Sequence, residues 1–313
     1  MVQRIDCPCQ VRSSADTTRA LEQLEIIRSR CAALREILVP DNIWPIFKQK
    51  AAEPYDQAFH HYILLGALRD GFLARITFPI HRFLLDTNKP KRSLTRQYKK
   101  DLAEKWMLKS TPLERHREAR IFFGKLTELL MAAWLEEQGW RINTLEALAG
   151  VFDIEATSPD KISFAIEVKY IGQLDSDFEE IVGKLSMGTP AGGTVNPYER
   201  FNYLMLRVYE AAKHLLDSNK RRLVAVVISQ IAWGFFERQI SDGWLQKRPI
   251  PFAPDTSPEW AAFLAEKKAE NKFSHIERDL DRVIHSLNEL WIVVEQNYLS
   301  YQLKNRFTVS NGS

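Results

Sequence analysis

The stretch FAIEVKYIG, residues 164–172, has the alternation of a β-strand that buries one face. One face of this strand is apolar and consists of Phe164, Ile166, Val168 and Tyr170. The other face carries Glu167 and Lys169, flanked by Ala165 and Ile171. A carboxylate and an ammonium on so apolar a strand need charged or hydrogen-bonding partners. Such partners are expected on neighbouring elements of the fold.

The preceding stretch VFDIEAT places a second acid within reach of Glu167. Its alternation predicts another strand, and SPDK between the two strands favours a turn. If the strands pair antiparallel across an odd-numbered loop, Asp153 lies opposite or diagonal to Glu167, because both are symmetric about residue 160. The two carboxylates would repel, and a divalent cation would remove the repulsion. Their oxygens and the Val168 carbonyl suit Mg²⁺.

A third acid lies on a long helix that is predicted to begin at residue 113 and to stop near Gly139. Glu128 is three or four residues from Gly124, Met131 and Ala132, so its carboxylate lies on a helix face that otherwise carries apolar or small residues. An inward-facing Glu is uncommon unless it is paired or bound to a metal. The alternative is a contact with Lys125 one turn away.

The remaining pattern predicts helices before and after these strands. An amphipathic helix over 15–38, stopped by Pro40, begins a helical region that extends to about residue 112. The order of elements implies a mixed α/β core from about 115 to 235. Further predicted elements are a helix over 199–217, a buried strand RRLVAVVIS, a helix starting at 257–259, a helix around 274–288, and a hairpin in LWIVVEQNYLSYQL.

The order GKLTELLMAAWLEEQGW, then FDI, then IEVK, resembles the PD-(D/E)XK nuclease superfamily over roughly residues 115–235. The resemblance implies the restriction-endonuclease-like fold, a mixed sheet flanked by helices. We expect a helical N-terminal region over 1–112, a nuclease core over 113–235 and an α+β C-terminal extension over 236–313. Phe152 stands where that family has Pro, and a long insertion, 172–198, follows the IEVK strand. It could form a substrate loop.

The resemblance further implies a metal-dependent nuclease, more an endonuclease than an exonuclease. The implied catalytic residues are Glu128, Asp153, Glu167 and Lys169. The implied ligands of Mg²⁺, or of Mn²⁺ in its place, are Asp153, Glu167, Val168 and Glu128. Metal ions would polarise the scissile phosphate of DNA, and Lys169 would orient the attacking nucleophile.

Two alternatives to that activity stay open. Glu167 and Lys169 form a surface ion pair in the first, with Asp153 as a turn or cap residue. In the second, the protein keeps the nuclease fold without cutting and acts as a DNA-binding or assembly subunit. The fold serves restriction, repair and anti-phage defence, and the sequence does not choose among them.

Composition limits the other classes of function. The 313 residues contain no stretch long and apolar enough for a membrane span, and MVQRIDCPCQ lacks the order of a secretory signal. Three cysteines are not a disulfide framework, and the spacing of Cys7 and Cys9 does not favour zinc. We expect a cytoplasmic protein that has no membrane partner. No nucleotide-binding motif is present, so ATPase or helicase activity would need a protein partner. A homodimer is left open.

The first 115 residues are the basic part of the chain, with 20 Lys and Arg against 13 Asp and Glu. The remainder has 23 against 27. Within this part, NKPKRSLTRQYKK, residues 88–100, contains six basic residues and no acid: Lys89, Lys91, Arg92, Arg96, Lys99 and Lys100. We expect this segment to bind the phosphates of DNA, and the alternative is a solvated basic surface.

Changing Arg96, Lys99 and Lys100 together to Glu should weaken DNA binding and flatten its dependence on salt. Each phosphate contact that is lost should lower the magnitude of the slope of log affinity against log salt by roughly 0.9. Binding isotherms over a series of salt concentrations measure both quantities. An unchanged affinity and slope would place the DNA on another surface.

Overall fold

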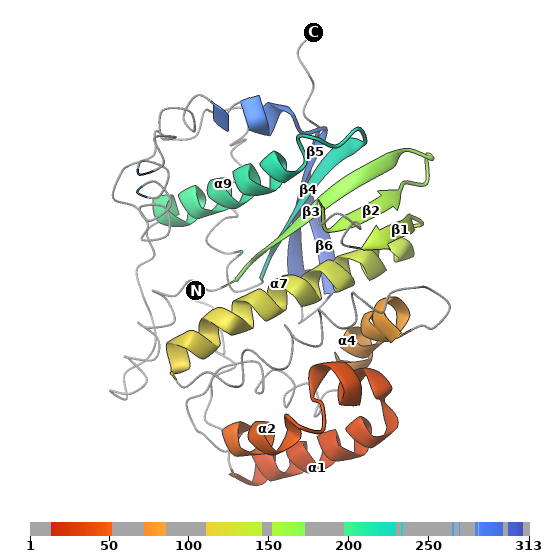
Figure 1. Cartoon of the computed structure of the whole chain (residues 1–313), viewed down its shortest axis with the longest axis vertical. Helices are drawn as coiled ribbons and strands as arrows, with labels where there is room; N and C mark the ends of the chain where they lie inside the picture. The colour runs from red at the N-terminus through yellow and green to blue at the C-terminus, as the bar shows by residue number, and fades with distance from the viewer. Residues whose placement is uncertain are drawn as a thin grey trace, which may run out of the picture. The chain divides into compact units, whose positions relative to one another are not determined.

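The computed structural model describes residues 14–51, 72–85, 111–145, 152–172, 197–229, 233, 265, 269, 279–280, 282–296 and 300–308. The chain divides into two compact units. The helical unit comprises residues 1–130 and 174–191, and the sheet unit comprises residues 131–173 and 192–313. Figure 1 labels the elements of both.

The helical unit contains, among its described residues, only helices. They are α1 (Ser14–Arg30), the π-helix η1 (Leu34–Leu38), α2 (Trp44–Ala51), α4 (Phe72–Ile80), the π-helix η2 (His81–Leu85) and the first part of α7 (Pro112–Glu137). The helical character predicted for this region is confirmed for these residues.

The single helix predicted over 15–38 is interrupted at Cys31, between α1 and η1. Arg28 explains why the chain turns soon afterwards. Its Nε donates to the carbonyl of Val39 at 2.7 Å, its Nη2 pairs with Asp41, and its guanidinium lies 5.2 Å from the Trp44 ring centroid. A buried guanidinium needs such partners, and they hold the segment after η1 against α1.

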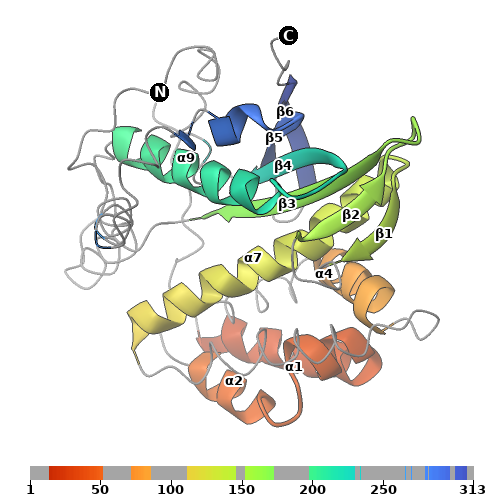
Figure 2. The same cartoon turned by 45° about the horizontal axis from the view of Figure 1, so that its top comes forward.

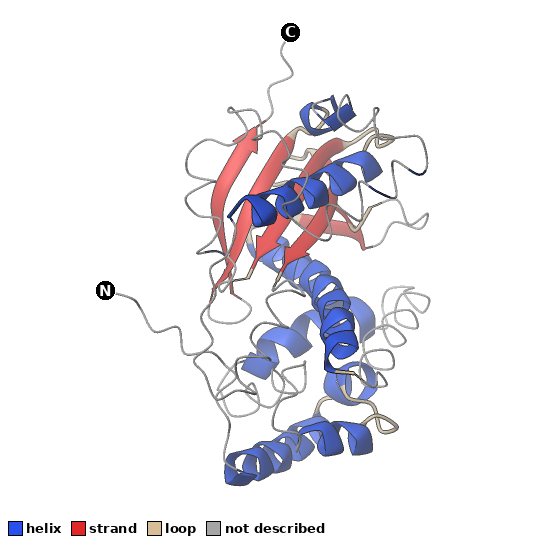
Figure 3. Ribbon diagram, turned by 90° about the vertical axis from the view of Figure 1, so that its left-hand side faces the viewer, coloured by secondary structure: helices blue, strands red, loops and turns tan. Residues whose placement is uncertain are grey.

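The sheet unit is built on one six-stranded mixed sheet whose strand order follows the sequence. The strands are β1 (Arg141–Leu145), β2 (Ile154–Thr157), β3 (Ser163–Ile171), β4 (Arg221–Ile228), β5 (Glu289–Gln296) and β6 (Ser300–Thr308). The β3–β4 and β4–β5 pairs are parallel, and the other pairs are antiparallel (Figure 3). The predicted mixed α/β class and the C-terminal hairpin are confirmed.

The β2–β3 hairpin has the predicted odd-numbered loop. Ile154 pairs with Ile166 and Thr157 with Ser163, so partner numbers are symmetric about residue 160. Lys161 occupies the left-handed region in this turn, with φ of 64°. The Ser158 hydroxyl accepts a hydrogen bond from the Ile162 N–H at 3.2 Å. The turn therefore holds the register that the sequence predicted.

Helices cover both faces of the sheet. The crossover helix α9 (Pro197–His214), between β3 and β4 in the chain, lies along one face of the sheet (Figure 2). Its Leu204, Val208 and Ala212 are part of a buried core that includes Val224 and Val226 of β4. On the other face, Trp134 near the end of α7 meets Trp291 of β5 with ring centroids 6.2 Å apart. Period-two alternation on β3 places Glu167 and Lys169 on the α9 face.

Some sequence predictions lie outside the described residues. They concern Cys7 and Cys9, the basic segment 88–100, most of the insertion 172–198 and the helix start at 257–259. The helix expected around 274–288 is described at residues 279–280 and 282–285, which are helical. In the described part of the chain, no helix has both the length and the apolar character that crossing a membrane requires.

Lys161→Gly should raise the free energy of unfolding by about 0.5–1 kcal/mol, because glycine adopts φ near +60° without steric cost. Urea unfolding checks this value. Gln302→Gly is the matched control, since Gln302 is exposed and pairs with Val294 inside strand β6, where glycine should destabilise by a similar amount. Equal destabilisation by both changes would show that the turn does not need the left-handed conformation.

Candidate active site

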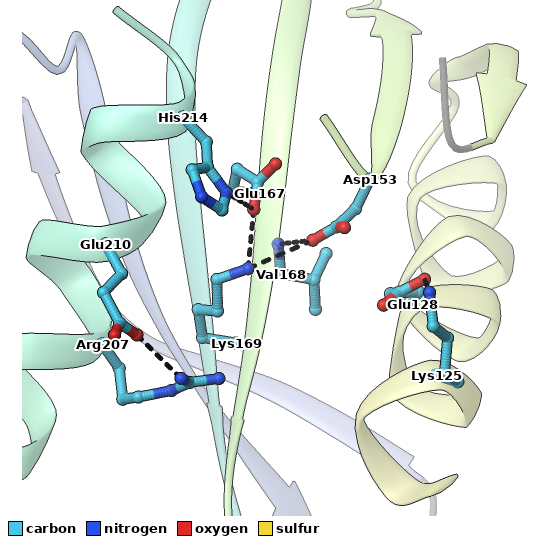
Figure 4. Close-up of polar contacts among 9 residues, drawn as sticks. All are labelled: Lys125, Glu128, Asp153, Glu167, Val168, Lys169, Arg207, Glu210 and His214. Atoms are coloured by element: carbon cyan, nitrogen blue, oxygen red, sulfur yellow. Dashed lines mark hydrogen bonds and ion pairs between the residues drawn. The ribbon is translucent and has the colours of Figure 1, made fainter. Parts of the chain in front are cut away.

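Asp153 immediately precedes β2 and ends the β2–β3 ladder with its side chain. Its Oδ2 accepts a hydrogen bond from the backbone N–H of Val168 at 2.8 Å (Figure 4). The carboxylate thus stands where a further residue of β2 would have offered its carbonyl. We predicted Asp153 within the strand, and the structure instead begins β2 one residue later, at Ile154.

Lys169 lies between the two carboxylates of the hairpin. Its Nζ is 2.6 Å from Glu167 Oε2 and 3.7 Å from Asp153 Oδ2 (Figure 4). The proximity of Asp153, Glu167 and Lys169, predicted from the hairpin register, is confirmed. The side chains of Glu167 and Lys169 are only 3% and 13% exposed. The ion pair of the alternative is therefore present, and Asp153 caps the ladder as that alternative supposed, but the pair is buried and does not lie at the surface.

The charges of this cluster do not balance, and the pKa of Glu167 reflects the imbalance. Burial, followed by repulsion from Asp153, raises the pKa of Glu167 to about 7, although Lys169 acts in the opposite direction. Burial alone would lower the pKa of Lys169, but the carboxylates of Asp153 and Glu167 outweigh it and raise that pKa above its ordinary value. The Lys169 ammonium therefore stays charged at neutral pH, whereas the Glu167 carboxyl group has a pKa close to neutral pH.

The oxygen atoms of the cluster fit Mg²⁺. In a strand, the N–H and C=O of one residue point to the same side, so the Val168 carbonyl points to the side where its N–H meets Asp153. Two carboxylates and a carbonyl are hard ligands, and Mg²⁺ uses one or two carboxylates and keeps its waters. Among the described residues, no group of three or more His, Cys, Asp or Glu could hold a metal ion.

Helix α9 brings further polar groups to the same face. His214 Nδ1 lies 3.7 Å from Glu167 Oε2, and its side chain is 62% exposed. Arg207 Nη1 pairs with Glu210 at 2.7 Å, and the Arg207 charge acts on Lys169, whose pKa it lowers slightly. The Nε of Arg207 is buried and has no hydrogen-bond partner in the part of the chain that the structure describes.

From the sequence alone, His214 has an ordinary surface or core role, and helix packing and solvent exposure explain Arg207 as well as an approach to a phosphate does. The feature of the sequence that could have placed both residues near the site is the order of β3, α9 and β4 along the chain. A crossover between parallel strands lays its helix across the sheet, so polar residues on the inner side of that helix come near β3. His214 and Arg207 are therefore additions that the structure makes to the predicted site.

Glu128 lies on α7 within the helical unit, whereas the other three predicted catalytic residues lie in the sheet unit. It is 8% exposed, and its Oε2 is 3.9 Å from Lys125 Nζ (Figure 4). This burial confirms the predicted inward orientation of Glu128. The contact with Lys125, which was the alternative explanation for this residue, is present as well. The role of Glu128 as a metal ligand stays a prediction.

The comparisons with known proteins do not assign this chain to a family. No family model matches it, and no curated protein does. A solved structure, Pyrococcus furiosus SfsA in complex with Ca²⁺, is similar over 59% of this chain and 62% of that chain. The sequence identity is 11% and the TM-score is 0.22. The sheet and its site define the class of protein: a mixed α/β protein in which the partly buried Asp153 and Lys169 meet the buried Glu167.

The metal-free protein should lose stability as pH rises. The folded-state pKa of Glu167 lies above its unfolded value, so its contribution is complete below about pH 4.5 and is lost as pH passes about 7. The loss is on the order of 3 kcal/mol. Urea unfolding in the presence of a chelator, at pH 5 and pH 8, should show this fall in the wild type and a smaller one in Glu167→Gln.

Glu155→Gln is the control for that measurement. Glu155 is on β2 of the same hairpin, is 21% exposed and pairs with Lys220 of the sheet unit. This variant should keep the pH dependence of the wild type. A wild type and a Glu167→Gln variant that fall by the same amount would mean that Glu167 is ionised over the whole range.

Proposed function

We propose that the protein is a metal-dependent nuclease that hydrolyses phosphodiester bonds, with DNA as the substrate. The observation that carries the proposal is the Lys169 ammonium held between Asp153 and Glu167 on a buried hairpin. A buried site with two carboxylates and one lysine combines a place for a divalent cation with a cation for the substrate phosphate. The order of these residues along the chain is that of the PD-(D/E)XK nucleases, and the restriction-endonuclease-like fold belongs to the same proposal.

Each residue has a role in this proposal. When bound, Mg²⁺ supplies Lewis acidity that polarises the scissile phosphate and lowers the pKa of an adjacent water. Asp153 and Glu167 would hold the ion through carboxylate oxygens, with the Val168 carbonyl as a further oxygen ligand. Lys169, charged at neutral pH, orients the attacking water and stabilises negative charge on the phosphate oxygens. The water oxygen bonds to phosphorus in line with the leaving oxygen as the scissile P–O bond breaks; the water releases a proton to solvent, and the leaving oxygen takes one up.

The groups from α9 extend this site toward a nucleic acid. Arg207 carries a buried Nε without a hydrogen-bond partner among the described residues. A phosphate oxygen of the substrate would satisfy such a donor, because Arg pairs well with phosphate. His214, largely exposed beside Glu167, adds a polar ring at the solvent side of the site. Restriction, repair and anti-phage defence all fit such a nuclease.

The second candidate is a nuclease-fold protein that binds DNA or assembles with a partner and does not cut. Lys169 already offsets part of the carboxylate charge at 2.6 Å, which favours this candidate because the cluster then holds together without a metal ion. In that case a protein partner would supply ATPase, helicase or nuclease activity. Metal-dependent cleavage by the purified protein distinguishes the two candidates.

Lys169→Ala should abolish cleavage, by at least about a hundredfold, while folding and DNA binding are retained. It removes the cation that stabilises the transition state and leaves both carboxylates in place. Linear and supercoiled DNA are incubated with the protein in Mg²⁺, Mn²⁺ or chelator, and products are resolved on gels. Cleavage should require Mg²⁺ or Mn²⁺ in the wild type.

Lys304→Ala is the matched control, because Lys304 is also a strand lysine, on β6, and is exposed. It should cleave like the wild type. Full activity of Lys169→Ala would reject the assignment of Lys169. Absence of cleavage in the wild type with every metal and substrate, together with retained DNA binding, would favour the non-cutting candidate.

A further inference from the structure

A pocket of about 500 Å³ opens in the sheet unit, on the face of the sheet opposite Glu167. Phe164 lines it, and because Phe164 and Glu167 are an odd number of residues apart on β3, their side chains leave opposite faces. The walls come from the end of α7, the β2–β3 turn, the starts of β4 and β5, and β6. The pocket is therefore separate from the candidate active site.

Aromatic rings form one side of the pocket. Trp134 and Trp140 each meet Trp291 edge to face, with centroids 6.2 and 5.6 Å away and planes at 88°. Phe164 lies 5.1 Å from Trp140. Trp134 and Trp140 are half-buried, so each indole leaves part of its surface open to the pocket. Open aromatic surface in a concave site favours a flat ring that can stack.

The charged groups of the pocket balance one another. Glu289, 2% exposed, accepts hydrogen bonds from Trp291 Nε1 at 2.8 Å and from Arg306 Nε and Nη2 at 2.9 Å each. Arg221 Nη2 lies 3.8 Å from the same carboxylate. With Asp160, the lining holds two carboxylates and two guanidinium groups. A balanced lining favours a ring without net charge over a phosphate.

The pocket also offers hydrogen bonds to the edge of such a ring. The Nε of Arg221 is buried and makes no hydrogen bond within the described residues, while its guanidinium lies 5.5 Å from the Phe164 ring centroid. A small rotation toward an acceptor in the pocket would satisfy this donor. Gln138 and Ser158 add an amide and a hydroxyl to the lining. A ligand with both a stacking face and a polar edge fits these groups.

We propose that this pocket binds one nucleobase, either as a free nucleoside or as an unpaired base of a single strand. A nucleobase is flat, uncharged and carries donors and acceptors on its edge, and a base with its sugar suits a pocket of this size. The single-strand source rests on the proposed nuclease function. The free-nucleoside source does not.

Equilibrium dialysis of the full-length protein with adenosine and with thymidine tests whether the pocket binds a free nucleoside. A labelled single-stranded oligonucleotide, compared with the same sugar-phosphate backbone lacking bases, tests the polymer. Leu303→Trp should fill the pocket, since Leu303 lines it and is 37% exposed. We expect base-dependent binding that this variant weakens about tenfold or more. The neighbouring exposed position gives the matched control, Lys304→Trp, which should bind like the wild type.

Arg221→Met provides a second variant, since it keeps the volume of the side chain and removes the donor; it should weaken base binding. Weaker binding of either probe in both pocket variants supports the proposal and identifies the source. Wild-type protein that binds neither nucleoside and does not distinguish the oligonucleotide from the baseless backbone overturns it, as does base binding unchanged by Leu303→Trp. Cleavage without base-dependent binding overturns this inference alone. Base binding without cleavage overturns the proposed function alone.

Discussion

The contact between Lys169 and the two carboxylates of the β2–β3 hairpin is the interaction on which the candidate active site depends. It exists because the hairpin pairs residues symmetrically about residue 160, which sets Asp153 beside Glu167. A slip of one residue would move Glu167 and Lys169 to the opposite face of the sheet. The turn at Ser158–Lys161, including the left-handed Lys161, is therefore part of the site as much as the charged residues are.

The core around the hairpin explains why the charges stay together. Val168 and Ile166 bury the opposite face of β3, and the inner face of α9 covers the side that bears Lys169. Exclusion of water strengthens the attraction between Lys169 and the carboxylates, and it also raises the cost of the second negative charge. The elevated pKa of Glu167 follows from that competition. A cation beside Glu167 would lower this cost.

The sequence predicted the parts of the fold that depend on local patterns. Period-two alternation identified β2 and β3, an apolar run identified β4, and Gly139, with φ of 82°, marked the end of α7. The turn of the chain after η1 depends on the tertiary contacts of Arg28 with Val39 and Trp44, which a local pattern does not reveal. His214 and Arg207 were missed for the same reason: only the path of α9 over the sheet brings them to Glu167 and Lys169.

Each face of the sheet buries a glutamate, and the charges of the two carboxylates are compensated to different extents. Glu289 is as buried as Glu167, yet it accepts hydrogen bonds from Trp291 and Arg306 and lies near Arg221. Its charge is therefore shared among several donors, whereas Glu167 shares the Lys169 ammonium with Asp153, a neighbour of like charge, and has the exposed His214 at 3.7 Å. A carboxylate that is fully paired holds a structure in place. One that is under-compensated retains capacity for a further cation, and this difference is the reason we propose chemistry on the α9 face and ligand binding on the opposite face.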